Sequence, residues 1–433
     1  MAIKKDYLRR NYYRLSAIKE SIICIFLFLI TKNFKLKSYK PFLYKKPISS
    51  TIFYNKIGIF LCSLKIFFSY FIPLFKNNIF YLSTKENLSN KSLFKDDNKL
   101  WPIPKMCKIE EDKDLEKETY DKLLKSYKMY YLQDDKKLPR GEWWQNYTDN
   151  FSNIFFEKNL EEINKFNLKN LFKVKSNVDL IQAHSFLAKG NRLKKFFRIA
   201  EVIGNYHDLY DIICPEILIN SSESKIFDCD AIIYRNQLLT DRLIRCIYYL
   251  SQIKKNTDLQ YDQRFIFLDL GGGYGCLTRL ILNLFHNSKG ILIDLPETCL
   301  LASYYLTKNF PNKKIKYLCD IKMNEKLDNK FFENTDLLII PTTLINLIPD
   351  HFVDLVINTA SLGEMSIEYG EFYMKNINRI TKKYFYSHNR KDATDSIWDG
   401  YGHYKYEFEG KWKTKLYNFS PGWHLEFLGE IEK

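Results

Sequence analysis

From residue 265 onward, short apolar segments alternate with amphipathic segments along the chain. Residues 265–270 and 290–295 have the compact apolar pattern of buried strands, and residues 275–285 and 297–309 have the helical spacing of the segments that follow them. Further strands are predicted at residues 314–319, 337–341, 353–359 and 383–387, with a helix over 368–380. This alternation predicts an α/β fold with a Rossmann-like, doubly wound and mainly parallel sheet.

The two ends of this pattern differ from its middle. Residues 404–408 and 411–417, joined through Glu409-Gly410, predict a hairpin that ends the sheet in antiparallel strands. Before the sheet, residues 154–172 and 237–253 carry apolar residues at three- and four-residue spacing, and a helical run lies near 110–131. We therefore expect three regions: an arm over 1–98, a mostly helical region over 99–256 and the sheet domain over 257–433.

Charge separates the arm from the rest of the chain. The formal net charge is +15, and residues 1–80 hold 15 lysines and arginines against Asp6 and Glu20 alone, whereas the other 353 residues hold 51 basic and 49 acidic residues. A nearly neutral folded part argues against nucleic-acid binding, which needs a basic stripe on the domain. The basic, apolar arm indicates peripheral contact with an anionic membrane, and a poorly ordered extension is the alternative.

Two apolar segments of the arm are poor candidates for a membrane span. Residues 22–30 are too few to cross a bilayer, and no small-residue cleavage site follows them, so secretion is not expected. Residues 57–75 are interrupted by Lys65 and Pro73, which favours peripheral attachment or internal packing. The nine cysteines form no C-x-x-C pair and their number is odd. We expect reduced thiols in a cytoplasmic protein, with the inner face of the membrane as a candidate location.

The most informative motif is the loop between the first strand and first helix of the sheet domain. It has the spacing D-x-G-x-G-x-G, formed by Asp269, Gly271, Gly273 and Gly275. Glycines allow a sharp turn and close approach of a ligand, and the helix start beyond them offers free N–H groups to a carboxylate. A dinucleotide fingerprint would have glycine where Cys276 stands. Together with the antiparallel ending of the sheet, this favours S-adenosyl-L-methionine as the cofactor.

Two acidic side chains are candidates for contacts with the rest of such a cofactor. Asp294 ends the strand after the glycine loop, where a carboxylate can accept both ribose hydroxyls. Asp320 ends the third strand and is our choice for the adenine. If residues 314–319 form an edge insertion, residues 341–343 take the place of Asp320 beside the adenine. The spacing does not decide between the two candidates.

Three residues are candidates for the base that deprotonates an acceptor. Glu364 follows the strand end that faces the reacting group, and the alternative is that it occupies the first turn of the next helix. His388 ends the following strand, and His403 lies in a glycine-rich loop. No set of His, Asp and Glu has metal-ligand spacing, so no metal site is predicted.

With these residues in place, the chain resembles the sugar O-methyltransferase family of bacterial surface-polysaccharide loci. The likeness is carried by residues 268–282, 291–311 and 354–365 with 383–390, and most specifically by Asp-Leu-Pro-Glu at 294–297 and the block at 358–365. It extends over about residues 180–433 and more weakly to Trp143-Trp144. His388 departs from the family pattern, in which another residue precedes the Asn-Arg pair.

The resemblance implies a class I methyltransferase fold, S-adenosylmethionine as methyl donor, and a sugar or glycan hydroxyl as acceptor in polysaccharide biosynthesis. The helical region before the sheet is then expected to shape the acceptor pocket. Two alternatives remain: an NAD(P)-dependent nucleotide-sugar oxidoreductase or epimerase, and a non-catalytic membrane-associated module. The sequence does not indicate an oligomeric state.

Overall fold

A computed structural model describes residues 105–108, 117–133, 217–218, 221–224, 230–234, 237–321, 326–390, 402, 405–420 and 424–432. The predicted arm, the predicted helix over 154–172, the Trp143-Trp144 pair and His403 lie outside these residues. Among the described helices, none combines the length and apolar character that crossing a membrane requires.

The chain divides into two compact units, and each is described by itself. The first comprises residues 1–109, 185–223 and 229–244. Its described part is a small antiparallel sheet in the order β1-β2-β3, formed by Lys105–Lys108, Asp230–Tyr234 and Gln237–Leu239. We did not predict this sheet from the sequence, because its strands are three to five residues long and lie far apart along the chain.

The second unit contains an eight-stranded sheet in the order β10-β11-β9-β8-β4-β5-β7-β6. The strands from β6 to β9 in this order run parallel, whereas β11 is antiparallel to both β9 and β10. The expected α/β fold with a mainly parallel, doubly wound sheet and an antiparallel ending is therefore confirmed. The strands are β4 Ile266–Leu270, β5 Lys289–Asp294, β6 Ile315–Lys316, β7 Leu337–Pro341, β8 Val353–Thr359, β9 Thr381–Arg390, β10 Trp412–Ser420 and β11 His424–Ile431.

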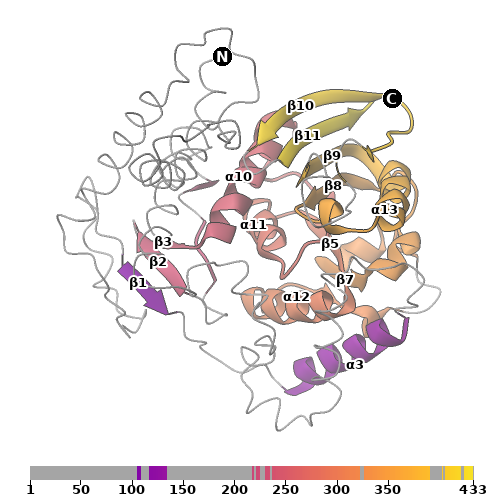
Figure 1. Ribbon diagram of the computed structural model, residues 1–433. Coiled ribbons are helices and arrows are strands. Elements are labelled where there is room, and N and C mark those ends of the chain that lie inside the picture. The colour runs from indigo at the N-terminus through magenta and orange to yellow at the C-terminus, as the bar shows by residue number, and fades with distance from the viewer. Residues whose placement is uncertain are drawn as a thin grey trace, which may run out of the picture. The chain divides into compact units, whose positions relative to one another are not determined.

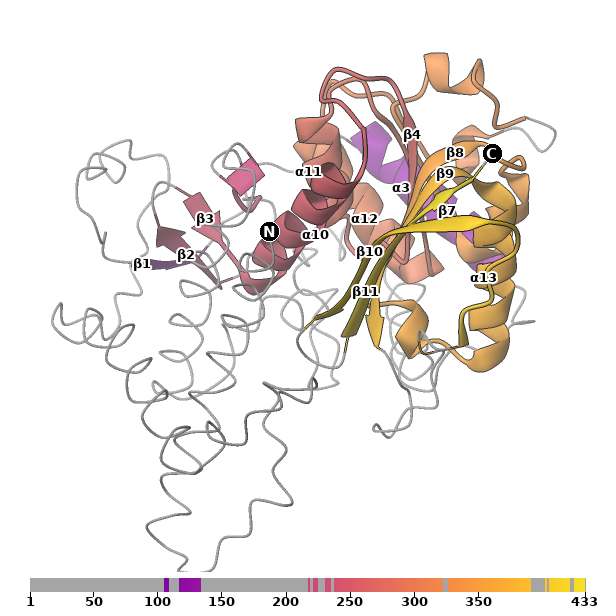
Figure 2. The same ribbon diagram turned by 90° about the horizontal axis from the view of Figure 1, so that it is seen from above.

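Helices cover both faces of this sheet (Figure 2). On one face lie α10, α11 and α12, and on the other lies α13. The helix α3 packs against α12 (Figure 1). Their bounds are α3 Lys117–Gln133, α10 Asp241–Asn256, α11 Cys276–Leu284, α12 Pro296–Asn309 and α13 Ile367–Ile380.

The core explains why the central strands are apolar at nearly every position. Strands β4 and β7 are buried along their whole length, as expected where helices cover both faces of a parallel sheet. One core layer joins alternate residues of β4, β5, β7 and β8 to the inner face of α13, which contributes Tyr373, Met374 and Ile377. Ser366 caps α13 by accepting a hydrogen bond from Tyr369 N–H, so the helix begins where its apolar stripe begins.

The predicted terminal hairpin was wrong in its first strand, whereas its second strand, 411–417, coincides with β10, and its antiparallel character was right. Residues 405–408 belong to no strand, and the hairpin is formed by β10 and β11 instead. Tyr406 and Phe408 place their rings against the core from an irregular segment, so their alternation reflects packing without ladder pairing. Strand β11 was missed.

Two further expectations differ in their bounds. The strand predicted over 314–319 is reduced to the two residues of β6, because a turn of 3₁₀ helix follows at Leu318–Asp320. The helix predicted from residue 237 begins at Asp241, since Gln237–Leu239 pairs with β2 and Thr240 caps the helix by accepting a hydrogen bond from Leu243 N–H at 3.1 Å.

Candidate functional site

The glycine loop connects β4 to α11 at the carboxyl edge of the sheet. Gly271, Gly273 and Gly275 all have positive φ angles, of 71°, 60° and 92°. The Gly271 N–H donates to the Ile293 carbonyl at 2.7 Å, which ties the loop to the neighbouring strand β5. A Cβ atom at Gly271 would lie 2.0 Å from Ser361 Oγ, so both conformation and space demand glycine there.

Asp269 lies beneath this loop. Its side chain is buried, and Oδ2 accepts a hydrogen bond from Thr278 Oγ1 of α11 at 2.7 Å. A Cβ atom at Gly272 would approach the same carboxylate to 3.0 Å. The first acidic residue of the motif therefore braces the loop against α11.

Asp294, at the end of β5, binds the glycine loop through a second set of hydrogen bonds. Oδ2 accepts the Gly273 N–H at 2.8 Å and Oδ1 accepts the Leu295 N–H at 2.7 Å, while part of the side chain stays open to solvent. Burial raises the pKa of this carboxyl to about 7, and the negative charge of Asp269 adds to the rise, against the two backbone hydrogen bonds. No lysine or arginine of the described chain forms an ion pair with Asp294.

Two asparagines join the ends of β4, β8 and β9. Asn358 is fully buried, and its Nδ2 donates to the Leu270 carbonyl at 2.8 Å while its Oδ1 accepts from Asn389 Nδ2 at 2.8 Å. Asn389 Oδ1 in turn accepts the Ser361 N–H at 2.9 Å. This network fixes the turn after β8 against the glycine loop. Asn358 belongs to the block at 358–365, whereas the role of Asn389 was missed, since its only signal in the sequence is the Asn-Arg pair at 389–390.

Glu364 lies in this turn and is half-buried. It ends a single turn of 3₁₀ helix at Leu362–Glu364, and its N–H donates to the Ser361 carbonyl at 2.9 Å. The first-turn acid of the following helix α13 is Glu368. The helix-start explanation therefore applies to Glu368, and Glu364 belongs to the loop at the carboxyl edge.

His388 lies near the carboxyl end of β9 with 7% of its surface exposed. Its ring contacts Tyr249 of α10, with ring centroids 4.7 Å apart, and Tyr248 at 6.3 Å. It pairs with Thr359 of β8, and its carbonyl accepts the Ala360 N–H at 2.9 Å. The histidine therefore belongs to the same edge of the sheet as the glycine loop.

The structure meets the condition attached to the second of the two adenine candidates, and both candidates remain predictions. Strand β6 is at the edge of the sheet, and β7 lies next to β5, with Pro341 directly opposite Asp294. Residues 341–343 therefore follow the strand beside Asp294. Asp320 instead closes its own turn, since Oδ2 accepts the Tyr317 N–H at 3.1 Å. The edge position of so short a strand is not visible in the sequence.

Two other kinds of site were considered in the sequence, a metal centre and a Tyr-x-x-x-Lys pair, and the described part of the chain shows the following for each. It contains no group of three or more His, Cys, Asp or Glu side chains that could hold a metal ion. Tyr304 and Lys308 of α12 have the Tyr-x-x-x-Lys spacing of some oxidoreductases, with Lys308 Nζ 3.2 Å from the hydroxyl. Tyr304 is 5% exposed and lies on the helix that follows β5.

The fold and site define a Rossmann-like domain with a ligand loop at the carboxyl edge of its sheet. No family model matches the chain, and none of the curated proteins matches it either. Among solved structures it is similar to the PH0226 protein from Pyrococcus horikoshii, at 11% identity and a TM-score of 0.33, over 45% of this chain and 92% of that one.

Two methyltransferases are similar at the same level. One is a SAM dependent methyltransferase from Aquifex aeolicus, at 14% identity and a TM-score of 0.27, over 42% of this chain and 89% of that one. The other is magnesium protoporphyrin IX methyltransferase from Synechocystis with bound SAM, at 9% identity and a TM-score of 0.30, over 44% and 81%. Likenesses of this size carry no argument about activity.

Proposed function

We propose that the protein is an S-adenosylmethionine-dependent O-methyltransferase that acts on a sugar hydroxyl. The observation that carries the proposal is the hydrogen-bonded contact between the glycine loop and the end of β5. There the Gly273 N–H holds the Asp294 carboxylate, which is partly open to solvent and has no cationic partner in the described chain. A carboxylate in this state is suited to accept the two hydroxyls of a ribose.

The described residues fit the cofactor in three places. Asp294 would take the ribose, and the N-terminus of the nine-residue helix α11 would face the methionyl carboxylate with the positive end of its dipole. Residues 341–343, beside Asp294 in the sheet, would border the adenine. Asp269 would act through the loop that it braces. When bound, the cofactor supplies a sulfonium methyl group that needs no further activation.

The chain would supply proximity, orientation and a proton acceptor on the other side of the site. The acceptor hydroxyl would lie over the carboxyl ends of β8 and β9. Glu364 lies in the turn that follows β8, and His388 lies near the carboxyl end of β9. One of them would take the proton of this hydroxyl while the oxygen is held in line with the methyl group. A sugar as the acceptor is supported by the motif resemblance alone.

Calorimetric titration of the full chain tests the cofactor. We expect S-adenosylmethionine and S-adenosylhomocysteine to bind, Asp294→Ala to abolish binding, and Glu364→Gln to retain it. Binding of NAD⁺ or NADP⁺ in their place would support the oxidoreductase alternative, and binding of neither cofactor class would support a non-catalytic module.

A methyl-transfer assay tests the acceptor. The full chain would be incubated with methyl-labelled S-adenosylmethionine and a panel of nucleotide sugars, lipid-linked sugars and polysaccharides. We expect an alkali-stable methyl ether on a sugar. Transfer only to phenols, amines or carboxylates would contradict the sugar assignment while leaving the methyltransferase assignment intact.

Residues 1–80 of the arm support a second, separable part of the proposal. Their net charge of +13 and their apolar segments are suited to peripheral contact with the anionic inner face of a membrane. Cosedimentation with vesicles containing an anionic lipid should therefore be lost when residues 1–80 are deleted or when salt is raised. Equal retention on neutral vesicles would contradict an electrostatic attachment.

A further inference from the structure

The turn that follows β8 contains a residue in an unfavourable backbone conformation. Ala360 has a φ angle of 51°, in the left-handed region that favours glycine. An alanine side chain has no polar atom that could stabilise this conformation by a local hydrogen bond, as asparagine or aspartate does. Such a conformation persists only where the surrounding structure imposes it. Its effect is to set the direction of the next residue, Ser361.

Hydrogen bonds from the end of β9 impose this conformation. The Ala360 N–H donates to the carbonyl of the residue before Asn389, and the Ser361 N–H donates to Asn389 Oδ1, both at 2.9 Å. Asn389 is fully buried, and its Nδ2 donates to the Asn358 carbonyl at 3.1 Å, to Asn358 Oδ1 at 2.8 Å and to Ser387 Oγ at 2.9 Å. The Asn389 amide is therefore held in one orientation, and its oxygen fixes the backbone of Ser361.

The Ser361 side chain lies against the glycine loop. A Cβ atom at Gly271 would lie 2.0 Å from Ser361 Oγ and 2.6 Å from Ser361 Cβ, so the serine side chain lies beside the Gly271 Cα. Ser361 precedes the 3₁₀ turn Leu362–Glu364, where a serine hydroxyl commonly accepts a backbone N–H, but its side chain forms no such cap. Ser361 is half-buried, and its hydroxyl has no hydrogen-bond partner among the described residues. This hydroxyl is therefore available to a ligand on the glycine loop.

The order of the strands indicates which part of the ligand meets this hydroxyl. Strand β4 lies between β5 and β8. In the proposed function the ribose lies at Asp294, at the end of β5, and the methionyl carboxylate lies at the start of α11, which follows β4. The amino-acid end of the cofactor then lies over β4, and β8 is the next strand beyond it, about 4.8 Å away. The side chain that reaches from the turn after β8 to Gly271 covers this spacing.

We propose that Ser361 binds the amino-acid end of S-adenosylmethionine through its hydroxyl, and that Asn389 is the positioning residue that holds Ser361 against the glycine loop. This inference rests on the proposed function. Because the helix start faces the carboxylate, the partner of the hydroxyl is the α-ammonium group, from which Ser361 Oγ accepts a hydrogen bond. A charged donor makes this bond stronger than one between neutral groups.

The test compares two ligands that differ in the amino-acid end. S-adenosylhomocysteine carries this end, and 5′-methylthioadenosine has the same nucleoside and sulfur without it. Both are titrated into the full chain by calorimetry, or by ligand-observed NMR where binding is weak. Ser361→Ala should weaken S-adenosylhomocysteine roughly tenfold or more and leave the affinity for 5′-methylthioadenosine unchanged. Equal weakening of the two ligands, or of neither, overturns the proposal. The variant keeps the Cβ atom beside Gly271, so it should fold.

The matched control removes a serine hydroxyl at the opposite edge of the sheet. Ser288 lies directly before β5, and its buried hydroxyl donates to the Phe285 carbonyl at 2.7 Å. Ser288→Ala should leave the affinities for both ligands unchanged, even if it lowers the thermal midpoint. A selective loss of S-adenosylhomocysteine in this control would mean that the difference between the ligands reports stability, and it would overturn the assignment of Ser361.

A pair of variants separates positioning by Asn389 from a role in stability alone. Asn389→Ala removes the acceptor of the Ser361 N–H and should weaken S-adenosylhomocysteine selectively, as Ser361→Ala does. Glycine adopts the left-handed conformation readily, so adding Ala360→Gly to Asn389→Ala should recover part of this selective loss. If Asn389 only stabilises the fold, both ligands should weaken together and Ala360→Gly should restore no selectivity, which would overturn its positioning role.

A further measurement applies if Asn389→Ala does not fold. Ala360→Gly in the otherwise unchanged chain relieves the strain while Asn389 still holds Ser361. This variant should raise the thermal midpoint by a few degrees and leave the affinity for S-adenosylhomocysteine unchanged. A lower midpoint would show that Ala360 is not strained, and it would overturn the role given to Asn389.

The inference and the proposed function fail in different ways. If neither S-adenosylmethionine nor S-adenosylhomocysteine binds the wild-type chain, the proposed function fails, and the role of Ser361 fails with it. If they bind and Ser361→Ala does not distinguish S-adenosylhomocysteine from 5′-methylthioadenosine, only this inference fails.

Discussion

The two ends of the same parallel strands hold their acidic residues in opposite ways. At the amino end of β7, Asp336 accepts a hydrogen bond from Lys289 Nζ at 2.8 Å and one from the Lys314 N–H at 2.7 Å. At the carboxyl end of the neighbouring strand β5, the Asp294 carboxylate accepts hydrogen bonds from the Gly273 and Leu295 N–H groups, at 2.8 and 2.7 Å. One carboxylate is neutralised by a cation, and the other is not.

The pKa values record this difference. Partial burial would raise the pKa of Asp336, but the hydrogen bonds from Lys289 and Lys314 outweigh it and hold the pKa below its usual value. For Asp294, burial dominates and raises the pKa to about 7. The amino end is therefore organised for stability, and the carboxyl end retains a carboxylate whose ionised form the free protein stabilises poorly.

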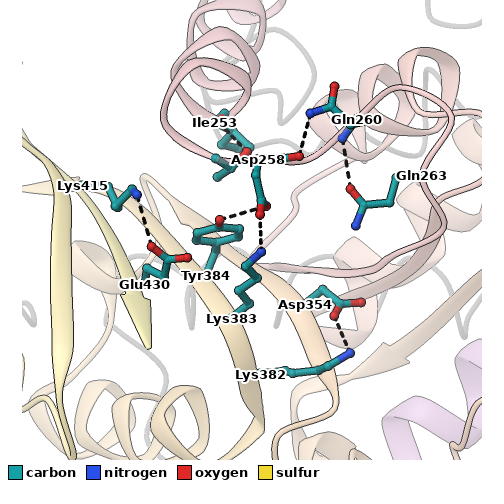
Figure 3. A network of polar contacts seen from close by, with 11 residues as sticks. Ile253, Asp258, Gln260, Gln263, Asp354, Lys382, Lys383, Tyr384, Lys415 and Glu430 are labelled. Carbon is teal, nitrogen blue, oxygen red and sulfur yellow. Dashed lines mark hydrogen bonds and ion pairs between the residues drawn. The ribbon is translucent and has the colours of Figure 1, made fainter. Parts of the chain in front are cut away.

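The rest of the amino edge follows the same rule (Figure 3). Asp258 lies between Lys383 Nζ, at 2.5 Å, and the Tyr384 hydroxyl, at 2.9 Å. Asp354 joins Lys382 Nζ at 2.8 Å to the Ile266 N–H at 2.9 Å, so it connects β8 to both neighbouring strands. These contacts hold the amino ends of β4, β8 and β9 together. Asp336, Asp258 and Asp354 at the amino edge thus each pair with a lysine, whereas no ion pair with Asp294 is found in the described chain.

The largest expected effect is at the glycine loop. Gly271→Ala should lower the free energy of unfolding by roughly 2–5 kcal/mol, because a positive φ and a collision with Ser361 act together. Cofactor binding should be lost in any folded fraction. Thermal unfolding and calorimetric titration measure the two effects.

The control for this substitution is Gly410→Ala. Gly410 also has a positive φ, of 79°, but a Cβ atom there would meet nothing within 4 Å. Its loss should be about 1–2 kcal/mol, from conformation alone. An equal loss in the two variants would show that the contact with Ser361 is not a constraint.

The next effect separates binding from stability at the carboxyl edge. Asp294→Asn should weaken binding of S-adenosylhomocysteine tenfold or more, because an amide is a poorer acceptor for two hydroxyls. It should change the stability of the free protein little at pH 8, because two effects oppose each other. Asparagine accepts only one of the two backbone N–H groups, but it removes an ionised carboxylate that costs the fold up to about 4 kcal/mol, a bound that its partial exposure to solvent reduces. A variant that loses stability at pH 8 would contradict this account.

The same carboxyl predicts opposite pH dependences for binding and for folding. Because the folded pKa lies above the unfolded value, the free protein should lose stability from this group as pH rises from about 4 to 7. Ligand hydroxyls favour the ionised carboxylate, so affinity for S-adenosylhomocysteine should fall up to tenfold per pH unit below about 7. Calorimetric titration at several pH values measures this affinity. An affinity that does not change with pH would exclude Asp294 as the group that binds the ligand.

A smaller effect is expected at the amino edge. Lys289→Met should lower the free energy of unfolding by about 1–2 kcal/mol near pH 7, because the partly buried Asp336 loses its cation. Since a lowered pKa stabilises the fold above the unfolded pKa, this difference should disappear as pH falls through about 4. Cofactor affinity should not change, and a change in affinity would break the proposed division between the two edges.

The smallest effect is expected where the pair is most exposed. Lys382 has 56% of its side chain exposed, so Lys382→Met should change the free energy of unfolding by no more than about 0.5 kcal/mol. Chemical denaturation resolves a change of this size only as a shift in midpoint. A loss above 1 kcal/mol would mean that Asp354 depends on this lysine to hold the Ile266 N–H.

The central strands could be predicted because they are buried on both faces of the sheet and are therefore apolar along their length. The helices could be predicted because their apolar residues recur at helical spacing. Strands β7 and β8 have the predicted bounds, and Gly271 and Asp294 lie at one edge as their order required. What the sequence could not predict depends on pairing partners distant along the chain. Knowledge of which strands are neighbours is needed to predict three features. They are the edge position of β6, the hydrogen bond between Asn358 and Asn389, and the hydrogen bond from the Tyr386 hydroxyl to Glu426.

The position of β11 has a consequence for synthesis of the protein. This strand is made after β10 but lies between β9 and β10, so β9 has an unpaired edge until residues 424–431 have left the ribosome. Glu426 also arrives only with this strand. A nascent chain can thus complete the glycine loop well before it completes the surroundings of His388, and we expect the cofactor-binding half to fold first.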